Sequence, residues 1–408
     1  MRKINPKDFT LATRGTSREI NRQIALTLVR AHQPVSRADL ARLMETNRAN
    51  VTLLVNELLD EGLIREGAQG TQKLRGRRPT YLYINSEKSV AVAIDVRASR
   101  SFMMITDSMG KQVGDIISFP TKFDPKEFVT SLGAQVRKAL RQATRSEACD
   151  GIGIVIPGML DRRNGRVVHA PTLGWRDFNL IEPLENEFGD TEIHLENSGK
   201  AQALSQVWST RGDGLLLNDI AFVSVSDGIG VGIVMNGELV RGRHNTAGEF
   251  GHLPLSIDGP QCSCGARGCW ETYISNPATL SRYFGRDVAP RHPQAVEVSE
   301  FTIEDLVSRA RGDDSRALTA LQSTARYLGL GLASIINSLD PSRIFVGGEI
   351  TEAWDLIEHN VRAAIKERAL TSELGDIPIT VVPAVEHPRL RGAVALVTAP
   401  AFAAPKVA

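Results

Sequence analysis

The sequence has no run of about 18 apolar residues, so it contains no segment able to span a membrane as a helix. Its first residues, Met1–Lys7, lack the apolar core of a secretory signal. Cysteine is also scarce: there are four in 408 residues, and Cys149 is remote from the other three, which is not a disulfide framework. These absences predict a protein of the reducing cytoplasm without membrane insertion.

Excess charge of one sign is absent overall, because the net charge is only +1. It is unevenly distributed, however. The first 88 residues hold 16 Lys and Arg against 9 Asp and Glu, whereas the rest hold 32 against 38. A basic N-terminal part on an acidic body favours a polyanionic partner for that part. The chain is also long enough for two or three domains.

Three of the four cysteines, Cys262, Cys264 and Cys269, fall within eight positions, and His252 precedes the first by ten residues. Thiolates with one imidazole are typical ligands of tetrahedral Zn2+. Four protein ligands leave no open position for a reacting water, so we expect a structural zinc ion. The alternative is a set of buried thiols beside an unrelated histidine.

The pattern before residue 85 predicts three helices and a hairpin. A capping box at Thr16 predicts the start of the first helix, and Ser36 is expected to cap a short second one. The third is expected from about Asn47 to Asp60, with apolar residues at helical spacing, and Gly62 ends it. Short strands on either side of a basic turn follow. This order predicts a winged helix-turn-helix.

Polar side chains lie off the apolar stripe of the third helix and suit contacts with base edges in the major groove: Asn47, Arg48, Asn50 and Thr52. The hairpin tip adds arginines that suit phosphates or the minor groove: Arg75, Arg77 and Arg78. We therefore predict that this part binds double-stranded DNA. The alternative is a three-helix interaction module with a solvated basic loop.

From Val90 onward the pattern changes to α/β. The first set of expected elements is strands over 90–95, 101–107, 112–119 and 151–156 with a helix over 125–145. The second set is strands over 220–226, 230–235, 238–240 and 343–346 with helices over 302–311 and 315–338. Two similar halves predict a bilobed body with a ligand cleft between the lobes. The predicted domains are 1–84 (winged helix-turn-helix), 85–89 (linker) and 90–408 (effector-binding body).

Several motifs resemble the ROK family, which includes sugar kinases and NagC/XylR-type transcriptional repressors. They are Gly248-Glu249-Phe250-Gly251-His252, the cysteine cluster with Trp270-Glu271, Pro157-Gly158 and Ala170–Trp175. The resemblance covers about residues 15 to 400. It implies an actin-like ATPase (sugar kinase-like) fold, and zinc bound by His252, Cys262, Cys264 and Cys269. It also implies a homo-oligomer, either a dimer or a tetramer.

Three features depart from the kinases of that family. Ser198 stands where those kinases place an Asp base directly after an Asn. The first phosphate loop, Asp95–Ser99, lacks both glycines of the family pattern, and the second carries Asp227 in place of a neutral threonine. A serine without a partner base cannot take a proton at neutral pH, and a carboxylate repels phosphate. We therefore expect no kinase activity and no catalytic residue.

The resemblance implies that sugar hydroxyls contact Asn197, Glu249, His252 and Glu271. The expected function is a sugar-responsive DNA-binding regulator, a repressor of genes for carbohydrate uptake or utilisation. Its partners would be operator DNA and a monosaccharide or derivative. The zinc loop and Glu271 share one segment, so we expect sugar to move the DNA-binding part through it.

Two alternatives stay open at this point. One is an active ROK sugar kinase with an accessory DNA-binding head. The other is a repressor controlled by a protein partner. An assay for ADP release distinguishes the first from the expected function, and operator binding with and without sugar distinguishes the second.

Overall fold

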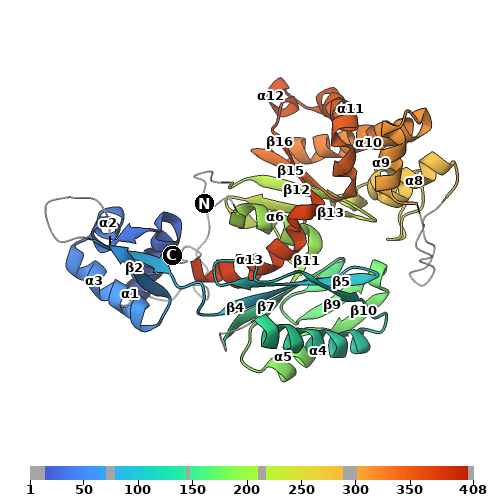
Figure 1. The fold of residues 1–408 in the computed structure, drawn as a ribbon. Coiled ribbons are helices and arrows are strands. Elements are labelled where there is room, and N and C mark those ends of the chain that lie inside the picture. The colour runs from blue at the N-terminus through green and yellow to red at the C-terminus, as the bar shows by residue number, and fades with distance from the viewer. Residues whose placement is uncertain (1–13, 70–78, 144–147, 210–216, 288–300, 403–408) are drawn as a thin grey trace.

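The computed structural model describes residues 14–69, 79–143, 148–209, 217–287 and 301–402. Three parts follow one another along the chain (Figure 1). We call residues 14–84 the head, the part built on the sheet that contains β4 (Val90–Asp95) lobe I, and the part built on the sheet that contains β12 (Ile220–Val225) lobe II. Among the described helices, none has the length and apolarity that crossing a bilayer requires.

The head contains α1 (Arg14–His32), β1 (Val35–Ser36), α2 (Arg37–Leu43), α3 (Arg48–Asp60), β2 (Ile64–Gln69) and β3 (Thr80–Ile84). Ser36 caps α2, as predicted, in a capping box with Asp39, and Asn47 caps α3, whose start was predicted at about that residue. α1 is already helical at Arg14, so Thr16 lies inside the helix and the start predicted there is wrong. β3 pairs antiparallel with both β1 and β2, which completes the predicted winged helix-turn-helix.

Lobe I continues with β5 (Arg100–Asp107), β6 (Ile117–Pro120), α4 (Pro125–Ala143), β7 (Cys149–Ile156), β8 (Met159–Asp161), β9 (Arg166–Ala170), η2 (Pro171–Leu173), β10 (Trp175–Asn179), α5 (Ile181–Phe188), β11 (Ile193–Asn197) and α6 (Ser198–Ser209). Its main sheet has the order β6-β5-β4-β7-β11, antiparallel from β4 to β6 and parallel from β4 to β11. The strand predicted over 112–119 begins only at Ile117. Gly114 breaks it with a φ of +72°, and Gln112 makes an isolated bridge.

Lobe II continues with β13 (Ile229–Met235), β14 (Glu238–Leu239), η4 (Phe250–His252), α7 (Glu271–Ile274), α8 (Asn276–Phe284), α9 (Ile303–Arg311), α10 (Ser315–Leu339), β15 (Arg343–Gly347), η6 (Glu349–Ala353), α11 (Trp354–Arg368), α12 (Ser372–Gly375), β16 (Ile379–Val382) and η7 (Ala384–Glu386). Its sheet order, β14-β13-β12-β15-β16, repeats that of lobe I: antiparallel on one side of the first strand and parallel on the other. The two lobes therefore share one topology, as the sequence predicted.

Two helices lie between the sheets (Figure 1). The last one, α13 (Pro388–Phe402), packs on β4 and β7 and runs beside α6, and α6 also contacts β12 and β13 of lobe II. The helices approach closely: a Cβ added to Gly392 would lie 2.0 Å from the carbonyl oxygen of Ala201. Only glycine permits that distance, so α6 and α13 are held as a tight pair.

The head packs on the far ends of this helix pair. The guanidinium of Arg30 on α1 lies over the ring of Trp208 at 3.6 Å and over that of Phe402 at 4.6 Å. Gln23 Nε2 donates to the carbonyl of Pro400 at 3.3 Å, and the Trp208 and Phe402 side chains belong to the apolar core of the head. The head is thus attached to the body through α6 and α13.

Candidate functional site

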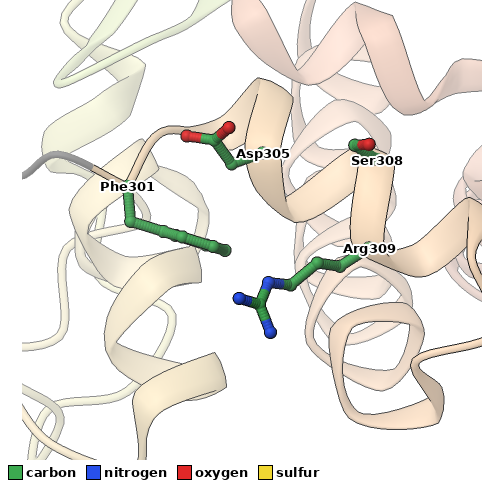
Figure 2. A pocket seen from close by; sticks show the side chains of 4 residues that line it. All are labelled: Phe301, Asp305, Ser308 and Arg309. Atoms are coloured by element: carbon green, nitrogen blue, oxygen red, sulfur yellow. The ribbon is translucent and has the colours of Figure 1, made fainter.

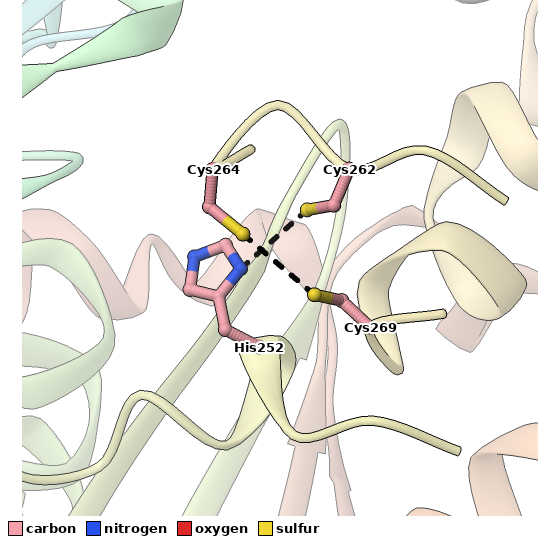
Figure 3. Close-up of side chains that lie close together, drawn as sticks. All are labelled: His252, Cys262, Cys264 and Cys269. Atoms are coloured by element: carbon pink, nitrogen blue, oxygen red, sulfur yellow. Dashed lines mark hydrogen bonds between the residues drawn. The ribbon is translucent and has the colours of Figure 1, made fainter. Parts of the chain in front are cut away.

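The four predicted zinc ligands converge in lobe II (Figure 3). His252 ends η4, Cys262 and Cys264 lie in the following loop, and Cys269 is drawn back by a bridge to Pro254. All four ligand atoms lie within 4.8 Å of one another. The Sγ atoms of Cys264 and Cys269 are 3.7 Å apart, and Cys262 Sγ is 3.6 Å from His252 Nδ1.

These spacings fit a tetrahedral zinc ion. With Zn–S of about 2.3 Å and Zn–N of about 2.0 Å, a tetrahedron has S–S edges of about 3.8 Å and S–N edges of about 3.5 Å. Burial raises the pKa of the Cys262 thiol, and burial with the neighbouring Cys264 raises the pKa of Cys269 to about 12. Metal binding therefore has to displace thiol protons. Cys149 takes no part; its thiol donates to the Gly151 carbonyl at 3.5 Å.

Glu271 links the loop that carries the cysteines to the turn between β12 and β13 of lobe II. It begins α7 directly after Trp270, and its Oε2 accepts a hydrogen bond from the backbone N–H of Ile229 at 2.9 Å. Its Oε1 lies 3.9 Å from Cys262 Sγ. The carboxylate is therefore fixed on one side by the β12–β13 turn and on the other by a zinc ligand.

The residues that the resemblance implies for sugar come from both lobes. Asn197 ends β11 of lobe I, donates from Nδ2 to the Gly158 carbonyl at 2.8 Å and accepts at Oδ1 from the Gly199 N–H at 2.9 Å. Glu249 of lobe II is half-buried. Burial raises its pKa, and the charges of Lys200 and His252 oppose that rise. Because His252 turns Nδ1 to the sulfurs, its Nε2 is left for another contact.

Sequence reasoning missed a buried charge cluster beside these residues. The Glu196 cluster consists of Glu196, Arg162, Lys200, Arg241 and Asn245. Glu196 is fully buried, and its Oε2 lies 3.3 Å from Arg162 Nε and 3.1 Å from an Arg241 guanidinium nitrogen. Burial lowers the pKa of Lys200, and the carboxylates of Glu249 and Glu196 oppose this. The members come from four chain segments. Only Glu196 and Lys200 lie in the sequence motif that contains Asn197.

The positions that correspond to kinase loops hold side-chain contacts of this chain. Arg97 Nε donates to the buried carboxylate of Asp95 at 2.7 Å, and its guanidinium lies over the Phe102 ring at 4.9 Å. Arg389, at the start of α13, lies 3.9 Å from the other oxygen of Asp95. Ser198 is buried as the first residue of α6. An ion-paired arginine thus stands in the turn after β4, which the resemblance predicted to be an altered phosphate loop.

The predicted base-reading face of α3 is exposed. Its residues Asn47, Arg48, Asn50 and Thr52 are all accessible, although Asn47 Oδ1 caps the Asn50 N–H and Thr52 Oγ1 donates to the Arg48 carbonyl. Sequence reasoning missed Leu53, which is 64% exposed on this helix and suits a thymine methyl group. Its place off the apolar stripe was the available signal. Arg75, Arg77 and Arg78 lie outside the described residues.

A surface hollow of about 500 Å³ lies elsewhere, on α9 of lobe II (Figure 2). Phe301, Asp305, Ser308 and Arg309 line it. Asp305 is engaged in the capping box of Thr302, and the Arg309 guanidinium lies over the Phe301 ring at 5.2 Å. These side chains are used within the fold, so this hollow contributes nothing to the site. The ligand cleft between the lobes stays a prediction.

Comparison with known proteins identifies similar chains. The xylose repressor of Bacillus subtilis (strain 168) is 30% identical over 360 residues, which covers 88% of this chain and 89% of that protein. The crystal structure of a ROK family transcriptional regulator, a homolog of the E. coli MLC protein, superposes with a TM-score of 0.78 at 24% identity, covering 95% and 97%. A ROK family glucokinase from Streptomyces griseus, in complex with glucose and AMPPNP, gives a TM-score of 0.62 at 25% identity, covering 76% and 99%.

The regulator structure matches head and body together, which confirms the predicted fold. The glucokinase matches a smaller share of this chain, although nearly all of its own length is used. Residues 91–399 match the ROK family. Because that match covers well over half of the sequence, the chain belongs to the ROK family.

Proposed function

We propose that the protein is a sugar-responsive, DNA-binding transcriptional regulator, a repressor of carbohydrate uptake or utilisation genes. The observation that carries this proposal is the attachment of a head with an exposed polar α3 to a sugar kinase-like body through α6 and α13. The similarity to the xylose repressor over 88% of the chain supports it. A homo-oligomer, dimer or tetramer, would place two heads on a two-fold operator.

In the proposed DNA complex, α3 enters the major groove and its polar face reads base edges. Arg48 is exposed near the start of the helix and has no acidic partner in the described part of the chain. Asn50 and Leu53 add an amide for base edges and an apolar contact. The wing arginines, Arg75, Arg77 and Arg78, would neutralise phosphates.

In the proposed effector site, a monosaccharide binds to Asn197, Glu249, His252 and Glu271. A carboxylate can accept from two adjacent hydroxyls, and losing one such partner is costly in a buried site. The zinc ion would be structural. Its ligand set includes His252 and is next to Glu271, so it would fix two sugar contacts in position.

We propose a path from sugar to DNA other than the one that the sequence suggested. α6 begins beside Asn197 and Lys200 and reaches Trp208 in the head core, and α13 runs from Arg389 to Phe402. These contacts favour α6 and α13 as the route, in place of the zinc segment. Sugar that prefers one position of the pair would change operator affinity by a coupling of about 1–3 kcal/mol.

The same proposal includes loss of kinase activity. Ser198 has no carboxylate to take a hydroxyl proton, and the Arg97–Asp95 ion pair stands in the turn expected to hold phosphate. The glucokinase similarity keeps an active kinase as the alternative function. A coupled assay for ADP with pentoses, hexoses and amino sugars tests it. Sustained turnover on any of them contradicts our reading of Ser198.

The main test starts with selection of bound sequences from random duplex DNA by the full chain. We expect a two-fold symmetric motif. Fluorescence anisotropy on that duplex is then measured with D-xylose, D-glucose or N-acetylglucosamine, and we expect at least one to change the affinity about fivefold or more. Arg48→Ala should weaken binding, whereas Arg141→Ala, an exposed arginine on α4, should not. Operator binding that ignores all sugars and depends on a co-purified protein supports the partner-controlled alternative.

A further inference from the structure

Beside the proposed sugar contacts, one buried polar atom lacks a partner within the described part of the chain, and one buried ammonium group has a single hydrogen bond. The Lys200 side chain is fully buried, and its Nζ donates one hydrogen bond, to the backbone carbonyl of Asn245 at 3.1 Å. An ammonium group has three protons to donate. Asn245 Oδ1 is also buried, and no described residue donates to it. An ammonium group with protons to spare thus contacts the residue whose side-chain oxygen has no donor.

The rest of the Glu196 cluster is satisfied. The Glu196 carboxylate is ion-paired with Arg162 and Arg241 and accepts a hydrogen bond from the backbone N–H of Asn197. Asn245 Nδ2 donates to Glu196 Oε1 at 3.4 Å and to the Leu160 carbonyl at 3.5 Å. Leaving a buried polar group unpaired costs about 1–3 kcal/mol. Asn245 also has a φ of +58°, a conformation that glycine adopts more easily. A bound group that donates to Asn245 Oδ1 would offset the cost of leaving that oxygen unpaired.

That point adjoins the proposed effector site. Lys200 follows Asn197 by three residues, and its N–H lies 3.3 Å from Asn197 Oδ1. On the other side, Lys200 is close enough to Glu249 for its charge to lower the pKa of that carboxyl against the effect of burial. A ligand held by Asn197 and Glu249 would therefore lie within reach of Lys200.

We propose that Lys200 and Asn245 form a hydroxyl subsite that selects a neutral sugar with an OH group at one ring position. The inference rests on the proposed function and names the chemistry of that site. A hydroxyl accepts from Nζ with a lone pair and donates its proton to Oδ1, so one group satisfies both residues. A deoxy position satisfies neither. A carboxylate or phosphate dianion has no proton for Oδ1.

The test uses the full chain and isothermal titration calorimetry. D-xylose, D-glucose and N-acetylglucosamine are titrated first, followed by the monodeoxy derivatives of the sugar that binds most tightly. Lys200→Met keeps a long side chain without the ammonium. Asn245→Gly removes the amide at a backbone position that suits glycine. Lys126→Met and Asn186→Ala, both exposed, are the matched controls.

We expect each subsite variant to bind the parent sugar at least tenfold more weakly, while the controls bind as the wild type does. Compared with the parent sugar, one monodeoxy sugar should bind the wild type at least tenfold more weakly but should bind Lys200→Met with little further loss of affinity. The reason is that removing the hydroxyl and removing the ammonium group abolish the same contact. If both variants bind the sugar as tightly as the wild type does, the proposed subsite is wrong, and water, not a sugar hydroxyl, contacts these two residues. If the wild type binds no sugar of the panel, the proposed function fails instead. Melting curves of Asn245→Gly confirm that lost affinity is not lost folding.

Discussion

The two lobes repeat one sheet topology but hold their equivalent turns in different ways. In lobe I the turn after β4 is held mainly by its own side chains, since Arg97 bonds to Asp95 at its start and Arg389 of α13 lies 3.9 Å from the same carboxylate. In lobe II the turn after β12 is fixed from outside, because the Ile229 N–H donates to Glu271 of the zinc segment. The shared fold therefore determines where a ligand-binding turn lies, whereas side chains from elsewhere determine what that turn can hold.

The helix pairs of the lobes differ in the same manner. α10 and α11 of lobe II approach at Gly329, where an added Cβ would lie 2.4 Å from the Val361 carbonyl oxygen. α6 and α13 of lobe I approach at Gly392 against Ala201. Only the lobe I pair contributes side chains to the apolar core of the head. Lobe II would thus serve mainly to build the site, and lobe I to transmit its state.

The largest effect should come from removing the metal site of lobe II. Cys264→Ser leaves three ligands, and loss of a structural metal is among the few changes that cost about 4 kcal/mol or more. The melting temperature should fall by on the order of 10 °C, with zinc content measured by mass spectrometry falling in parallel. Cys149→Ser, which alters a thiol outside the cluster, should keep its metal. Full zinc and unchanged melting in Cys264→Ser contradict the structural role.

The helix pairs provide a matched second test. Gly392→Ala and Gly329→Ala each force a methyl group onto a carbonyl oxygen, and such overpacking costs about 1–3 kcal/mol. Both variants should melt earlier than the wild type. Only Gly392→Ala should also change operator affinity or its response to sugar, as measured by anisotropy. Gly312→Ala, where the methyl would meet atoms at 3.5 Å, is the control. Equal effects of both variants on DNA binding rule out a special role for α6 and α13.

The sequence predicted the zinc ligands because they fall within a short segment and their chemistry is distinctive. It predicted most strands of both lobes because those strands are continuous apolar runs between turns. The Glu196 cluster could not be predicted in this way, since its members meet only after the β8–β9 turn, β11 and the loop after β14 have been brought together.

α13 was also missed, for a different reason. Helices are found by a polar face alternating with an apolar one, but α13 is covered by β4, β7 and α6 and has apolar residues on most sides. Gly392 and the internal Pro400 also argue locally against a helix. Burial in the body overrides those preferences. The route now proposed from sugar to head was therefore hidden from sequence reasoning.

A smaller effect is expected at the contact between head and body. Arg30→Ala removes the guanidinium from the rings of Trp208 and Phe402, a contact of about 1–2 kcal/mol when partly desolvated. Operator binding without sugar should change little, while the ratio of affinities with and without sugar should fall several-fold. Arg18→Ala, on the same helix but paired with Glu57 inside the head, is the control. An unchanged sugar response in Arg30→Ala removes this contact from the route.

The smallest effect concerns the stability of lobe I against pH. Burial lowers the pKa of Lys200 below its ordinary 10.5, so the folded chain holds this proton less tightly than the unfolded chain does. The free energy of unfolding of the wild type should therefore rise relative to Lys200→Met as the pH is raised toward 10.5. Urea unfolding at about pH 7 and about pH 9.5, with Lys126→Met as control, measures the difference. If the free energy of unfolding changes with pH to the same extent in the wild type and in Lys200→Met, burial of the Lys200 ammonium group does not destabilise the fold. Burial of this ammonium group would then have no cost for a ligand to offset, while the zinc site of lobe II would be unaffected.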